Sequence, residues 1–200
     1  MMSDIALAMD NYPDADPNDW FEIIEGVKTM AASARGGHNI IAAKIFSAFD
    51  AYFIRNNIGA VAIPDVDVYL PDGNLFRPDL CVICESAKFD DDGKIHGVPE
   101  LCVEVLSPST AKNDLGIKMT IYARNGVKEY WIVYPREKII NVYKLSDGYY
   151  VLDGVYHSYD KAEFDDLTDA ERAEVKDKIQ VGIFPELFVD VDRIFKWWSH

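Results

Sequence analysis

Apolar residues recur every three to four positions in parts of this chain, which is the spacing of one helix face. Residues 38–57 predict the longest helix, and Gly59 follows it as a residue that tolerates the left-handed conformation of a helix C-terminus. Residues 113–127 predict a second helix of about three turns that stops at Gly126. Residues 171–200 predict a polar linker or short strand followed by a terminal helix.

Other segments alternate between apolar and polar residues or are apolar throughout, as strands are. Residues 20–30 predict an N-terminal hairpin that turns at Glu25 and Gly26, and residues 60–73 predict a hairpin that ends in a Pro-Asp-Gly turn. Residues 80–85 and 98–107 are almost wholly apolar, which is typical of strands covered on both faces. Further strands are predicted at 127–135, 139–145 and 148–160.

A strand, a helix and a strand in succession between residues 98 and 135 form a crossover unit, which indicates an α/β fold. The 200 residues, 49% of them hydrophobic, suffice for one domain with a substantial core. Residues 1–18 are polar and contain two prolines, so we expect a flexible lead-in before a single domain at 19–200.

Cysteine usage and the N-terminus indicate where the protein works. Cys81, Cys84 and Cys102 lie in apolar runs, so we expect small buried residues; CxxC spacing at 81–84 without a second ligand pair argues against zinc. The N-terminus has no basic, apolar leader, and no apolar stretch approaches a membrane span. The expected location is the cytoplasm, without a membrane partner.

Two carboxylates carry the candidate chemistry. Asp79 begins one buried strand, and Glu104 lies inside the next between Val103 and Val105. An ionised carboxylate in an apolar run is costly unless it is paired or binds a metal. Magnesium prefers a few carboxylates together with water, so Asp79, Glu104 and the main-chain carbonyl of Val105 are the predicted metal ligands. The alternative for Glu104 is a buried ion pair with Arg77 or Lys118.

Lys118 is the third candidate, because it follows the Glu104 strand on the predicted helix. There it could orient or deprotonate a water and offset charge on a phosphate. His38, at the start of the long helix, is either a structural cap or an accessory group of the site. In the N-terminal hairpin, Glu22 or Glu25 is a further candidate carboxylate, with a solvated strand residue as the alternative.

The segments RPDLCVI, PELCVEVLSPST and NGVKEYWIVYP together resemble a bacterial family of putative restriction endonucleases within the PD-(D/E)xK nuclease superfamily. The resemblance extends from EIIEG to GIFPELFVDVDRIF and covers nearly the whole chain from Trp20. It implies a restriction-endonuclease-like three-layer α/β/α core around a mixed sheet, here with added N-terminal and C-terminal hairpins. It also implies magnesium-dependent phosphodiester cleavage, with Asp79 and Glu104 as metal ligands and Lys118 as the catalytic lysine.

One position departs from the superfamily pattern, which would place the lysine at 106, where this chain has Leu106. The family resemblance moves the lysine to the following helix and favours Lys118 over Lys112, its nearest competitor.

The net charge of −14 opposes strong binding to nucleic acid, although a local basic rim would suffice for contact. The prediction is therefore a DNA endonuclease that binds weakly or with a partner's help and uses magnesium, for which manganese can substitute. The alternatives are an inactive nuclease-fold binding module and a hydrolase of small phosphoesters. A sheet edge and the aromatic cluster 195–198 further predict a homodimer.

Overall fold

The computed structural model describes residues 21–30, 36–84 and 88–196. Its centre is a mixed sheet, in which β9 and β10 pair in parallel and the other neighbours pair antiparallel. From one edge to the other it contains β12 (Tyr149–His157), β11 (Ile139–Ser146), β10 (Glu129–Tyr134), β9 (Leu101–Val105), β6 (Leu80–Ile83) and β3 (Val61–Ile63). The two apolar runs of the sequence therefore form β6 and β9 inside the sheet, as predicted.

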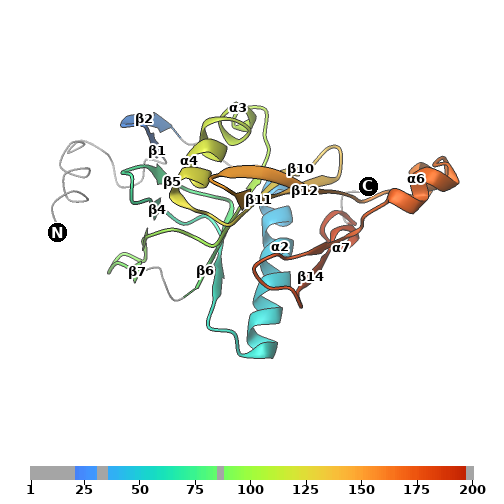
Figure 1. Cartoon of the computed structure of the whole chain (residues 1–200), viewed down its shortest axis with the longest axis horizontal. Coiled ribbons are helices and arrows are strands. Elements are labelled where there is room, and N and C mark those ends of the chain that lie inside the picture. The colour runs from blue at the N-terminus through green and yellow to red at the C-terminus, as the bar shows by residue number, and fades with distance from the viewer. Residues whose placement is uncertain (1–20, 31–35, 85–87, 197–200) are drawn as a thin grey trace.

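Helices cover both faces of this sheet, which gives the three layers expected of an α/β/α core (Figure 1). On one face lies α2 (Gly36–Asn56), whose Ile41, Ile45 and Phe49 are fully buried against Val103 and Trp131 among others. On the other face lies α4 (Ile117–Asn125), where Ile121 and Tyr122 pack with the opposite side chains of the same strands. The fold is a mixed α/β fold of the restriction-endonuclease-like type.

The parallel pair β9 and β10 is joined by the predicted crossover, but its helix is not continuous. It is divided into α3 (Ala111–Asp114) and α4, which begins after Gly116. The expectation of one unbroken helix over 113–127 is wrong because Gly116 leaves the helical region, with φ −124° and ψ −97°. A Cβ at this position would lie 2.9 Å from the carbonyl oxygen of Lys112, so the close approach requires glycine.

A second sheet lies beside the first and carries the N-terminal hairpin. Its strands, in order, are β2 (Val27–Met30), β1 (Phe21–Ile24), β5 (Leu75–Phe76), β4 (Val68–Tyr69), β8 (Ile95–His96) and β7 (Lys88–Phe89). The predicted hairpin turns both form: Gly26 has φ +77° between β1 and β2, and Gly73 has φ +86° between β4 and β5. This second sheet places β1 beside the central sheet.

The C-terminal part ends in a hairpin of β13 (Lys178–Gln180) and β14 (Phe188–Asp190), followed by α7 (Val191–Phe195). The predicted terminal helix is therefore confirmed. Of the two alternatives before that helix, the short strand is confirmed as β13, whereas residues 171–174 belong to the short helix α6 (Asp169–Glu174). A further short helix, α5 (Lys161–Asp165), was not predicted. Each of these two short helices begins with a capping box, Asp160 with Glu163 and Thr168 with Glu171, in which side chain and main chain exchange hydrogen bonds.

Several further predictions concern single residues and can be compared with the structure. Cys81 and Cys102 are buried, Cys84 is partly buried, and none of the three forms a disulfide. Phe195 belongs to the core, so it contributes no aromatic surface. The predicted lead-in at 1–18 lies outside the described residues, as do Trp197 and Trp198. The homodimer stays a prediction, now with edge strand β12 as the apolar surface. Among the described helices, none has the length and hydropathy to cross a membrane.

Candidate active site

Asp79 and Glu104 lie on neighbouring antiparallel strands at the same end of the sheet. Leu80 on β6 pairs with Val103 on β9, so Asp79, one residue earlier, lies across from Glu104. Directly opposite residues of an antiparallel pair project from the same face. The main-chain amide of Val105 donates a hydrogen bond to Asp79 Oδ2 at 2.6 Å, which holds the Asp79 carboxylate against β9.

Lys118 is buried under three carboxylates, and we call this group the Lys118 cluster. The Lys118 Nζ atom lies 2.7 Å from Glu22 Oε1, 3.2 Å from Glu104 Oε1 and 3.2 Å from Asp114 Oδ1. The side chains of the cluster are between 1% and 7% exposed. The structure therefore brings Lys118 to Glu104, as the sequence suggested, and adds two acidic partners.

The two additional carboxylates come from two different elements of the fold. Glu22 lies on β1, where its Oε1 also accepts a hydrogen bond from the Arg77 amide at 3.4 Å. Asp114 ends α3 and forms its ion pair with Lys118 four residues later. The sequence did not assign Asp114 to the site, although an acid four residues before a lysine is a recognisable helix pair.

Two neighbours hold the candidate carboxylates Asp79 and Glu104 in place. The Tyr122 hydroxyl, one helical turn beyond Lys118, donates a hydrogen bond to Glu104 Oε1 at 3.2 Å. His38 Nε2 lies 2.6 Å from Asp79 Oδ1, which places the start of α2 beside β6. Tyr122 is fully buried, so it is a core residue that also contacts Glu104.

Two other residues that the sequence suggested do not belong to the Lys118 cluster. Glu25 forms an ion pair with Arg124 at 2.6 Å and is half exposed, so Glu22, not Glu25, is the carboxylate that the N-terminal hairpin supplies. Lys112 is exposed on α3 and is not part of the cluster.

Electrostatics in this cluster are unusual because several acids share one buried cation. Burial raises the pKa of Glu104 well above its usual range; Lys118 opposes the rise, while Asp114, Asp79 and Glu22 add to it. Burial alone would lower the pKa of Lys118, but Glu104, Asp114 and Glu22 hold it well above its usual range. Lys118 is therefore a firmly protonated ammonium group at neutral pH.

The donor atoms fit a hard divalent cation. Among the described residues, no three His, Cys, Asp or Glu side chains form a ready-made metal cage. Magnesium does not need one, because it commonly binds through one or two carboxylates and keeps several waters. Both described hydrogen bonds to Glu104 end on Oε1, and the excess of buried carboxylates over lysine favours a further positive charge. Asp79 and Glu104 could hold such an ion.

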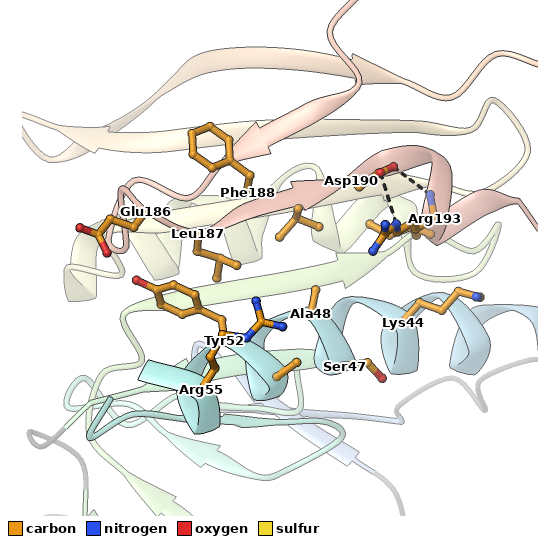
Figure 2. A pocket seen from close by; sticks show the side chains of 13 residues that line it. Lys44, Ser47, Ala48, Tyr52, Arg55, Glu186, Leu187, Phe188, Asp190 and Arg193 are labelled. Carbon is orange, nitrogen blue, oxygen red and sulfur yellow. Dashed lines mark hydrogen bonds and ion pairs between the residues drawn. The ribbon is translucent and has the colours of Figure 1, made fainter. Parts of the chain in front are cut away.

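Among the cavities on the described surface are two that residues of α2 line. One, of about 450 Å³, adjoins His38 and the residues that follow β9 and β10, so it opens beside Asp79 and Glu104. Figure 2 shows the other, of about 600 Å³, between α2 and the C-terminal hairpin with α7. Lys44 and Arg55 of α2 face Leu187 and Asp190 there, and no member of the Lys118 cluster lines it.

Comparison with known proteins agrees with the fold. The structure is similar to that of a putative nuclease of the DUF820 family from Anabaena variabilis, with a TM-score of 0.71 and 17% sequence identity. The match covers 95% of this chain and 97% of the other. A search of curated proteins finds no match. The family profile described as "Putative restriction endonuclease", Uma2, matches residues 8–174, and the chain therefore belongs to this family.

Proposed function

We propose that this protein is a magnesium-dependent phosphodiester hydrolase that acts as a DNA endonuclease. The observation that carries the proposal is the position of Asp79 across from Glu104, with the ammonium group of Lys118 on the same glutamate. Membership of a nuclease family supports the reaction class. The metal, the DNA substrate and the roles of single residues are our inference from the chemistry of the side chains.

In this proposal Asp79, Glu104 and the main-chain carbonyl of Val105 hold the magnesium ion, for which manganese can substitute. When bound, the ion supplies Lewis-acid stabilisation of the phosphate and makes a water molecule more acidic. The protein contributes the geometry: the Val105 amide fixes Asp79 Oδ2, and the Tyr122 hydroxyl fixes Glu104 Oε1. Side chains held in this way lose little entropy when the substrate arrives.

Lys118 acts as a hydrogen-bond donor in this scheme. Because neighbouring carboxylates keep its pKa high, it stays protonated and serves to orient the water or the phosphate, not to remove a proton. Its charge also offsets the negative charge that develops on the phosphate oxygens. Glu22 and Asp114 are positioning residues, since both contact Lys118 Nζ.

The test is cleavage by Glu104→Gln, which keeps the size of the side chain but removes its charge. We expect at least a ~100-fold loss of magnesium-dependent DNA cleavage, because one charged group of the reacting centre is lost. The matched control is Glu129→Gln, another buried glutamate, which accepts hydrogen bonds from Trp131 Nε1 and the Gly182 amide instead. We expect this control to cleave near the wild-type rate.

Circular dichroism and thermal unfolding of both variants check that they are folded. Wild-type cleavage by folded Glu104→Gln, or equal losses in both variants, would contradict the proposed site.

A second candidate function is a binding module that has lost turnover. The specific observation in its favour is that Lys118 already neutralises part of the acidic cluster by direct ion pairs. Titration calorimetry with magnesium separates the two functions. A nuclease site binds the ion in the wild type and loses it in Glu104→Gln, whereas an inactive module gives no heat in either protein.

A further inference from the structure

The cavity beside the Lys118 cluster has the size and lining of a pocket for a flat organic group. It measures about 450 Å³ and is lined by Leu106, Pro108, Leu115, Tyr134 and Pro135, with Arg136 and Glu137 at the turn after β10. Small-molecule pockets typically have a volume in this range, mostly apolar walls and a few polar groups. The exposed Leu115, 43% accessible, is a large apolar side chain available for contact.

The register of the sheet places this pocket next to the candidate metal ligands. Val133 on β10 pairs in parallel with Val105 on β9, so Tyr134 lies beside Leu106. Residues two apart on a strand project from the same face at a separation of about 6.6 Å, so Leu106 follows Glu104 on that face. His38, which contacts Asp79, lines the pocket as well.

We propose that this pocket binds a nucleobase, and that the substrate is a nucleic acid with an unpaired nucleotide beside the scissile phosphate. The inference rests on the proposed function, which places a phosphate at Asp79 and Glu104. A base inside a duplex must first be unpaired and unstacked before it can enter a pocket of this kind, whereas a base of a single strand enters without that cost. Tyr134 supplies an aromatic side chain of the kind on which bases stack.

The net charge of the chain also favours a single-stranded substrate over a duplex. Duplex binding depends mainly on many phosphate contacts to lysine and arginine, and a net charge of −14 opposes them. Stacking of a base on an aromatic ring and apolar walls needs no excess of positive charge. Arg136, exposed at the mouth of the pocket, is available for one neighbouring phosphate.

The test is metal-free binding of a fluorescein-labelled oligodeoxynucleotide, supplied as a single strand and as a blunt duplex of the same sequence. Fluorescence anisotropy should show that the wild type binds the single strand about tenfold more tightly than the duplex. Tyr134→Leu keeps an apolar side chain but removes the ring, and it should weaken single-strand binding about tenfold without changing duplex binding.

Two further variants complete the design. Leu115→Ala changes an exposed residue, so it should remain folded and still weaken single-strand binding. Phe188→Leu is the matched aromatic control, because Phe188 is 57% exposed and lines the other cavity. It should bind the single strand as the wild type does.

The outcomes separate this inference from the proposed function. Equal affinity for single strand and duplex, unchanged binding by Tyr134→Leu and Leu115→Ala, or an equal loss in Phe188→Leu would overturn the nucleobase pocket. Cleavage of duplex DNA without a single-strand preference would keep the nuclease and remove the pocket. A preference that depends on Tyr134 in a protein that never cleaves would keep the pocket and contradict the nuclease.

Discussion

In the Lys118 cluster the carboxylates outnumber the ammonium group, and this excess of negative charge is the main indication of a cation-binding site. A single buried ion pair breaks even at best against its desolvation cost. Here three carboxylates contact one ammonium group, and Asp79 lies close enough to raise the pKa of Glu104 further. Such an arrangement costs stability, and a bound cation would offset that cost.

Replacement of the two competing lysines tests which of them serves the reaction. Lys118→Met should reduce magnesium-dependent cleavage by about 10²–10³-fold, since it removes a donor aimed at the reacting centre. It should also lower the free energy of unfolding by about 3–5 kcal/mol, because buried carboxylates lose their partner. Lys112→Met, at an exposed position, should leave both quantities unchanged. Cleavage assays and urea unfolding measure them; a loss only in Lys112→Met would reverse the assignment.

The sequence alone indicated those site residues that differ in character from the neighbouring residues along the chain. Asp79 and Glu104 stand out because their own strands are apolar, and that property is visible along the chain. The sequence left Glu22 and Glu25 as alternatives and did not assign Tyr122 to the site, since the roles of Glu22 and Tyr122 depend on contacts 18 or more residues away with Arg77, Lys118 or Glu104. Glu25 was a reasonable candidate by sequence, but the turn of the hairpin directs it to Arg124.

Among the elements, the crossover between β9 and β10 carries two members of the Lys118 cluster. Asp114 of α3 and Lys118 of α4 lie 3.2 Å apart across the break at Gly116. Between them, Leu115 lies exposed beside the cavity. A continuous helix would have the same sequence spacing but a different orientation of α3.

Gly116→Ala should therefore impair both stability and cleavage. The new Cβ would lie 2.9 Å from the Lys112 carbonyl oxygen, a contact with main chain that must be relieved by moving α3. We expect a loss of about 1–3 kcal/mol in unfolding free energy, as for other overpacked sites, together with slower cleavage. Thermal unfolding and the cleavage assay measure the two effects.

Gly148→Ala is the control for destabilisation alone. Gly148 has φ +84° in the turn between β11 and β12, so alanine is strained there although nothing lies within 4 Å. We expect a stability loss with normal cleavage below the unfolding temperature. Equal effects of the two variants on cleavage would mean that the break at Gly116 does not position the site.

The elements that the sequence predicted well are those with a strong period or a long apolar run. The long helix, the buried strands and the glycine turns belong to this class. The two short helices α5 and α6 were missed because their apolar face is almost absent, although their capping boxes were present in the sequence. The break at Gly116 was missed because a single glycine is compatible with a helix unless packing decides otherwise.

On the scale of the whole molecule, the acidic charge and the small apolar cavity limit what the protein can hold. With a net charge of −14, broad contact with a duplex is disfavoured, and the pocket of about 450 Å³ is the proposed site of a single nucleobase. The edge strand β12 exposes Tyr149, Val151 and Leu152, which suits the predicted homodimer. Sedimentation velocity of the wild type and Val151→Lys checks that prediction: only the wild type should form dimers.

A crystal structure with manganese is the direct test of the proposed metal site at Asp79 and Glu104. We predict an anomalous density peak bounded by carboxylate oxygens of Asp79 and Glu104, at roughly the 2.0–2.1 Å distances of magnesium-type coordination or slightly longer. The peak should be absent in crystals of Glu104→Gln. Density without a manganese peak, with Lys118 still paired to Glu104 at saturating manganese, would contradict the account.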